Sequence, residues 1–227
     1  MTLGYALLLA VSLLVLFGVG QRVLDRMRLT DRQALMAMAA VFAGGLIPDI
    51  PLGPVLSFNL GGALLPAVFC IVLIAKADST GERFRALAAS ILGAAGVLVI
   101  DRLLPADPVA LPVEPNWIYG IVCGLAAYLM GRSRRSALIG GVFGVLLADI
   151  FQGGLSLSQG IPAPIALGSG GALDTGVIAG LTAVLTAEAI GEIRERLQGG
   201  TAHTDMEYSH GDFVPVHTKG GQHEDKK

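Results

Sequence analysis

The chain alternates long apolar stretches with short charged connections, and this alternation constrains its fold more than any other feature. A helix needs about 20 apolar residues to cross the hydrocarbon core of a bilayer. Only helices or closed barrels pair all their backbone groups there, and segments of this length favour helices. We therefore expect an all-α, polytopic transmembrane helix bundle with seven spans. The seven stretches are residues 2–20, 33–48, 59–76, 86–104, 116–131, 136–152 and 174–190.

Composition supports a membrane protein and argues against other classes. Hydrophobic residues make up 53% of the 227 residues and charged residues 15%, against about 25% charged residues in an average soluble domain. Mean hydropathy is +0.66, more than a soluble domain of this size can bury. Two cysteines are too few for a disulfide scaffold, and a net charge of −2 without a basic face argues against nucleic-acid binding. The expected partner is the lipid bilayer.

The basic residues define the expected orientation of the chain. Of the 16 Lys and Arg, all except Arg102 lie in connections on one side of the membrane or after the last apolar stretch. Lys and Arg accumulate on the cytoplasmic side, so we expect the amino terminus outside and the carboxyl terminus inside. Residues 2–20 have no positive charge before them and several after them. This pattern favours a retained helix over a cleaved signal peptide.

Residues 1–198 are expected to form the transmembrane domain, and the polar residues 199–227 a disordered cytoplasmic tail. Glycines and a proline separate the histidines of this tail, which favours a solvated segment over a metal site. We expect neither a metal nor another cofactor. Cys70 and Cys123 lie in apolar stretches and are expected to be small core residues. The histidines are His203, His210, His217 and His223.

Two segments of the chain resemble each other at a constant offset of 109 residues. Phe42 matches Phe151, and proline-bearing loops separate two Gly-Gly pairs in each copy. Chance is the alternative, because Gly, Ala and Leu are abundant, but the identical spacing favours a true repeat. The halves are then about residues 1–76 and 116–190, joined by a linker helix at 86–104 in a parallel 3+1+3 plan. The glycine pairs are Gly44-Gly45 and Gly61-Gly62, then Gly153-Gly154 and Gly170-Gly171.

Repeats of this kind commonly place a functional site at their interface. The loops 48–58 and 153–173 can re-enter the protein, which is tolerated only where backbone is buried or lines a wet cavity. Asn59 precedes the Gly61-Gly62 pair and is positioned to bond across helices. The candidate substrate-binding or cavity-lining residues are Asn59, Gly61, Gly62, Gly170 and Gly171.

Asp149 and Asp174 are the candidate catalytic or coupling residues. Both occur only in the second copy of the repeat, and an ionisable group inside a membrane span is a functional hypothesis by default. Asp149 lies about 20 Å along its helix from Ser136, and Asp174 opens the next helix. The two carboxyls can then meet in the outer half and share one proton. Alternatively, each lies at a hydrated helix end with Asp174 as an N-cap, as we expect for Asp49 and Asp101.

Such an aspartate pair has three possible uses. An aspartyl protease needs two carboxylates that share a proton to activate water. Asp174-Thr175-Gly176 matches the aspartic protease tripeptide, and the arrangement resembles presenilin-type intramembrane proteases, although Leu173 replaces their glycine. A transporter for a small solute can use the pair as a proton or cation site. The 3+1+3 plan resembles small sugar transporters, without their Pro-Gln dipeptide. A structural pair fixes helix packing.

Four motifs, spread over residues 44–187, resemble those of domain of unknown function family 1614, a set of prokaryotic polytopic membrane proteins. The resemblance implies a multi-pass protein of a prokaryotic cell membrane, and it supports Asp149 and Asp174 as family-pattern positions. It implies no reaction, so the activity and the membrane or small-molecule substrate stay open. The motifs are Ile50-Pro51-Leu52, Asn59-Leu60-Gly61-Gly62-Ala63-Leu64-Leu65-Pro66, Ala148-Asp149 and Gly170-Gly171-Ala172-Leu173-Asp174.

The orientation can be tested by labelling single cysteines in intact cells. With Cys70 and Cys123 replaced by alanine, cysteines at Ala110 and Thr201 should react with an impermeant maleimide from opposite sides. The basic residues predict Ala110 outside and Thr201 inside. Labelling of both positions from one side would contradict the seven-span prediction and the repeat derived from it.

Overall fold

The structure, a computed structural model, describes residues 27, 29–77, 79–104, 114–160, 165–171, 174–197, 206–209 and 212–215. The chain divides into two units, Met1–Ile190 and Gly191–Lys227. The first unit contains most of the helices and a small sheet, and the second contains the end of the last helix and a hairpin. The predicted first span at 2–20 lies outside the described residues.

Helices occupy the six other segments predicted to be apolar spans. Serine and threonine caps define several of their starts: Thr30 forms a capping box with Gln33, and Ser79 and Ser133 each accept a backbone N–H of the first turn. α5, α7 and residues Thr175–Arg194 of α8 are long and apolar enough to cross a membrane. The helices are α3 (Asp31–Gly45), the π-helical turn η1 (Leu60–Leu64) with α4 (Leu65–Ala75), α5 (Thr80–Leu103), α6 (Pro115–Gly131), α7 (Arg134–Ser158) and α8 (Thr175–Leu197).

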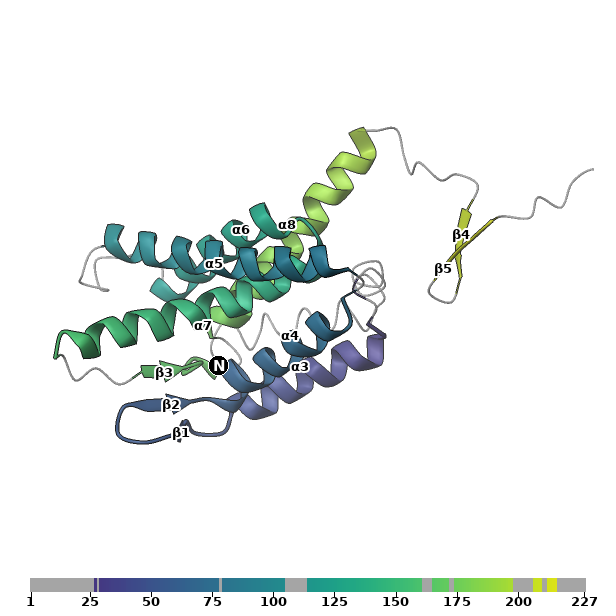
Figure 1. Cartoon of the computed structure of the whole chain (residues 1–227). Coiled ribbons are helices and arrows are strands. Elements are labelled where there is room, and N and C mark those ends of the chain that lie inside the picture. Colours follow the sequence, from purple (N-terminus) through teal and green to yellow (C-terminus); the bar gives the residue numbers. More distant parts are fainter. Residues whose placement is uncertain are drawn as a thin grey trace, which may run out of the picture. The chain divides into compact units, whose positions relative to one another are not determined.

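Small residues allow α5, α6, α7 and α8 to pack closely (Figure 1). A Cβ on Gly140 would lie 2.5 Å from the Cβ of Ala89, and one on Gly141 would lie 2.7 Å from the carbonyl oxygen of Ala179. Helices in a membrane associate through such close backbone approach, since apolar side chains gain little by leaving lipid. Cys70 and Cys123 are free and fully buried, which confirms them as core residues.

A buried arginine joins the starts of α5 and α7. The Arg135 guanidinium is 3% exposed and donates to the Glu82 carboxylate at 3.2 Å. It also donates to the carbonyl oxygens of Lys76 and Met27, each at 3.2 Å. Arg134 pairs with Glu188 of α8. A buried charge is tolerated where it is paired and hydrogen-bonded in this way.

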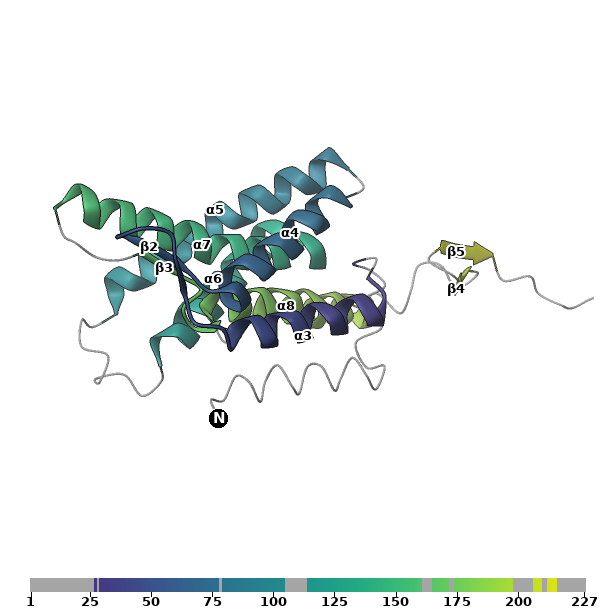
Figure 2. The ribbon, with the colours of Figure 1, turned by 90° about the horizontal axis from the view of Figure 1, so that it is seen from below.

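A three-stranded sheet lies within the otherwise helical unit (Figure 1), and two of its strands are labelled in Figure 2. Strand β1 (Ile50–Pro51) pairs antiparallel with β2 (Leu56–Phe58), and β2 pairs in parallel with β3 (Ile165–Leu167). Leu56, Ser57 and Phe58 face Ile165, Ala166 and Leu167, so each residue faces a partner 109 positions later. The all-α prediction missed these strands. Their pairing satisfies backbone groups that would otherwise lack partners away from water.

Two other features of the structure differ from those predicted. α7 continues through Gly153-Gly154 to Ser158, so the second loop begins after these glycines. In the second unit, β4 (Met206–Ser209) and β5 (Asp212–Pro215) form an antiparallel hairpin where we expected no regular structure. Both strands contain aromatic or β-branched residues, and only two residues separate them. The four histidines lie outside the described residues.

Glycine substitutions test whether the sheet and the π-helical turn need close backbone contact. A Cβ on Gly62 would lie 2.0 Å from the carbonyl oxygen of Gly168, whereas a Cβ on Gly154 would meet nothing within 4 Å. We expect Gly62→Ala to lower the free energy of unfolding by about 1–3 kcal/mol or more. Gly154→Ala should raise it by up to about 1 kcal/mol. Unfolding in mixed micelles, followed by circular dichroism, measures both; equal stability of the two variants would contradict this contact.

Candidate functional site

Asn59 connects the elements that lie between α3 and α4. It lies between β2 and η1 and is 3% exposed. Its side-chain oxygen accepts from the backbone N–H of Gly61 at 2.9 Å and of Gly62 at 3.1 Å. Its amide nitrogen donates to the Ile47 carbonyl at 2.9 Å and to the Asp49 carboxylate at 3.0 Å. Asn59 therefore caps η1 and connects it to the chain that leaves α3.

The predicted glycines form contacts between backbones. A Cβ on Gly61 would lie 2.2 Å from the carbonyl oxygen of Val41, and one on Gly171 would lie 2.8 Å from that of Gly45. Gly171 also has a φ of 62°, which favours glycine. Gly170 is exposed in the turn after β3. Neither of the two cavities described below includes any of these glycines. Gly61 and Gly171 instead let η1 and the turn after β3 lie against the end of α3.

Asp174 is the N-cap of α8, and it is buried. Its carboxylate accepts from the backbone N–H of Gly176 at 3.0 Å, and Gly170 and Thr175 contribute further backbone hydrogen bonds. Its carbonyl oxygen accepts the first helical bonds, from Val177 and Ile178. The side chain is 7% exposed. The alternative prediction was therefore right about the cap and wrong about hydration.

Asp149 is half-buried on α7 and makes no hydrogen bond to a described residue. Asp174 lies close enough to act on it electrostatically, and Asp49 acts on Asp174 in the same way. The structure thus brings the two predicted aspartates near each other, although no hydrogen bond joins their carboxyls within the described part of the chain. Our sequence analysis treated Asp49 as a separate hydrated residue. Its position in the proline-bearing loop before Asn59 was the available signal.

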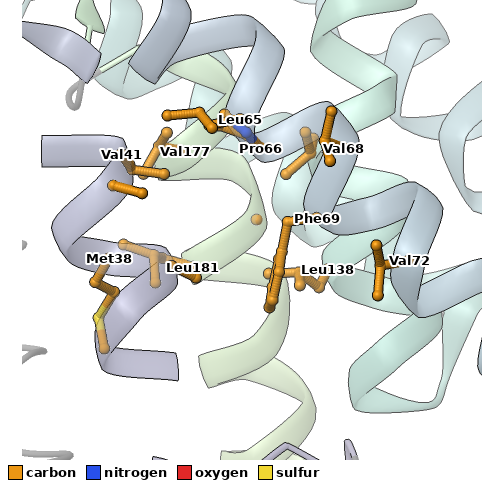
Figure 3. A pocket seen from close by; sticks show the side chains of 14 residues that line it. Met38, Val41, Leu65, Pro66, Val68, Phe69, Val72, Leu138, Val177 and Leu181 are labelled. Atoms are coloured by element: carbon orange, nitrogen blue, oxygen red, sulfur yellow. The ribbon is translucent and has the colours of Figure 1, made fainter. Parts of the chain in front are cut away.

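An apolar cavity of about 300 Å³ begins one helical turn beyond Asp174 (Figure 3). It lies among α3, α4, α7 and α8, and Val177 in the first turn of α8 is one of its lining residues. No charged side chain lines it. Such a cavity accepts an apolar ligand or an apolar part of one. The described residues contain no group of three His, Cys, Asp or Glu that could hold a metal ion. Its lining includes Met38, Val41, Leu65, Phe69, Leu138 and Leu181.

Comparison with known proteins gives a family for this arrangement. A family model described as YphA-like integral membrane protein matches residues 53–207, more than half of the chain. The chain belongs to the YphA-like integral membrane protein family. This result confirms an integral membrane protein, but it does not support the family name that the sequence motifs pointed to. The matched range contains Asn59, Asp149 and Asp174. No curated protein and no solved structure matches the chain.

Asn59→Asp, alone and in combination with Asp49→Asn, tests the contact between the two side chains. Asn59→Asp keeps the acceptor for Gly61 and Gly62 but places an oxygen against the Ile47 carbonyl and the Asp49 carboxylate. We expect this change to lower the free energy of unfolding by about 1–3 kcal/mol, because two part-buried hydrogen bonds are lost. Adding Asp49→Asn restores a donor and should recover about 1 kcal/mol. Mixed-micelle unfolding measures both steps. Purely additive losses in the double variant would show that these side chains do not interact.

Proposed function

We propose that this YphA-like protein is a proton-coupled membrane transporter for a small organic cation with apolar groups, with Asp149 and Asp174 as its proton-binding carboxyls. The observation that carries the proposal is the pairing of β2, in the connection between α3 and α4, with β3, in the connection between α7 and α8, close to both aspartates. Transporters commonly bind substrate and coupling ion at the interface between structural repeats. The proposal places the chain in a prokaryotic cell membrane as a multi-pass protein.

The arrangement of elements supports a parallel repeat. α3, β2, η1 and α4 follow one another in the first segment, and α7, β3 and α8 follow one another in the second. The paired residues of β2 and β3 differ by 109 positions, the offset of the Gly-Gly pairs. These facts support a parallel repeat. The 3+1+3 plan, the seven spans and the amino terminus outside belong to the same proposal.

The surroundings of the aspartates indicate the class of solute. Asp49, Asp149 and Asp174 give the region negative charge, while the adjoining cavity is apolar. An apolar molecule with a positive charge satisfies both conditions. Asp149 is the residue available to a proton or a cation, because it has no hydrogen-bond partner among the described residues. Asp174 is held in its cap by backbone donors and contributes charge from a defined position.

Proton binding and solute binding then compete. Ionised carboxyls attract a cation, and protonation removes that attraction and releases the cation. Solute affinity should therefore rise with pH. An intramembrane aspartyl protease is supported by the Asp174-Thr175-Gly176 tripeptide, but its mechanism needs a proton shared between two carboxyls. The backbone bonds of Asp174 and the missing carboxyl–carboxyl hydrogen bond favour the transporter.

Uptake of tetraphenylphosphonium into proteoliposomes tests the proposal, since this probe is both apolar and cationic. With the membrane potential clamped to zero, an acidic lumen should drive uptake by exchange for protons. Asp149→Asn should reduce uptake to the level of protein-free liposomes. Glu114→Gln, which changes an exposed carboxyl without a side-chain capping bond, is the matched control and should leave uptake unchanged. Unaltered uptake in Asp149→Asn would overturn the proposal.

Asparagine variants also separate the three functions. In the proposed transporter, Asp149→Asn and Asp174→Asn abolish proton-driven uptake, and they weaken solute binding and remove its pH dependence, because a carboxylate that attracts the cation is gone. A protease would lose cleavage of a membrane substrate at unchanged abundance. A structural pair would show lower stability and no activity to lose. Thermal unfolding of the same preparations distinguishes this last outcome from the others.

A further inference from the structure

A second cavity, of about 390 Å³, lies between the ends of α5 and α7. It is separate from the apolar cavity described above, and the two share no lining residue. Its walls combine apolar side chains with three polar ones. The apolar residues include Leu98, Val99, Phe151 and Leu155, and the polar ones are Asp101, Arg102 and Gln152.

We call this second cavity the groove. Hydrogen bonds to Asp101 hold its walls in place. Tyr119 of α6 donates its hydroxyl to one carboxylate oxygen at 2.8 Å. Gln152 of α7 donates its amide to the other oxygen, also at 2.8 Å. Both oxygens of Asp101 are therefore already engaged, and three helices are joined at one level. Hydrogen bonds between the three helices therefore define the shape of the groove.

Arg102 differs from Asp101 in that the described residues do not engage its charged group. Its side chain is exposed and makes no hydrogen bond or ion pair with any residue that the structure describes. It lies at the end of α5 opposite Arg83 and Arg85, and it is the one basic residue that the sequence places on that side of the membrane. α5 is long enough to cross a bilayer. Its end, and the Arg102 guanidinium, consequently reach the level of the lipid headgroups.

The walls beside Arg102 are apolar and exposed. Val99 and Phe151 are each 59% exposed, and Leu103 is 73% exposed. Such residues favour hydrocarbon over water, whereas the guanidinium favours an anion and matches phosphate oxygens with two donors. One ligand class meets both requirements at this depth. It has a phosphate joined to acyl chains.

We propose that the groove between α5 and α7 is a phospholipid-binding site, with the lipid phosphate on Arg102 and an acyl chain along Val99 and Phe151. Basic pockets between transmembrane helices bind phospholipid headgroups by this combination of charge and apolar contact. The apolar walls select a lipid over free phosphate. The site is independent of the proposed transport reaction, because none of its lining residues is assigned a role there.

Fluorescence quenching by brominated lipid tests the site in the full chain. Val99→Trp, made together with Trp117→Phe, places the single tryptophan on the groove wall. In phosphatidylcholine vesicles, added phosphatidylglycerol with brominated acyl chains should quench this tryptophan more strongly than its bulk fraction predicts. Arg102→Gln should lower the relative association constant about fivefold, the effect of one basic side chain near a lipid surface. Arg83→Gln, an exposed arginine at the other end of α5, is the control and should change nothing.

Two results would overturn the proposal. Equal quenching in Arg102→Gln and the parent protein would show that the arginine does not hold the lipid. Displacement of the brominated lipid by millimolar inorganic phosphate would show a simple anion site. Unchanged quenching in phosphate, together with the loss in Arg102→Gln, supports a lipid. Circular dichroism of each variant verifies that the helices are intact.

Discussion

The backbone pairing of β2 with β3 is the interaction on which the rest of this structure depends. β2 lies between α3 and η1, and β3 lies between α7 and α8. A peptide group left unpaired away from water costs several kcal/mol. Neither strand pairs its backbone groups only with residues near it in the sequence, because β2 and β3 pair with each other. Asn59 extends the pairing, because its backbone N–H donates to Leu167 and its side chain caps η1. The two segments therefore form as one unit.

Glycine makes this pairing sterically possible. Gly61 and Gly62 approach the backbones of Val41 and Gly168 too closely for any side chain. The start of α8 lies against α7 through close contacts such as Gly141 with Ala179, and Asp174 and Asp149 come within electrostatic reach. In the proposed repeat, Asp174 corresponds to Leu65, which opens α4.

Polar contacts at the two ends of α5 and α7 leave an apolar middle. Arg135 and Glu82 connect the helix starts, and Asp101 connects the opposite ends through Tyr119 and Gln152. Between these levels, small residues let the helices touch, and the cavity beside α3 and α4 is lined by apolar side chains. Asp149, in contrast, is a half-buried carboxyl on α7 with no hydrogen-bond partner among the described residues. This contrast is why Asp149 is central to the proposed function.

The sequence by itself determined the helical segments and the membrane environment, because the length and apolarity of a span are local properties. It also singled out Asn59, the glycine pairs and both aspartates as special residues. Tertiary structure alone decided what they contact. A three-residue strand such as Leu56–Phe58 has no detectable pattern of its own, and its partner lies 109 residues later. The burial of Asp174, the link from Asp49 to Asn59 and the engagement of both Asp101 oxygens likewise depend on which distant backbones meet. Such meetings are set by packing between helices, which no local pattern of residues encodes.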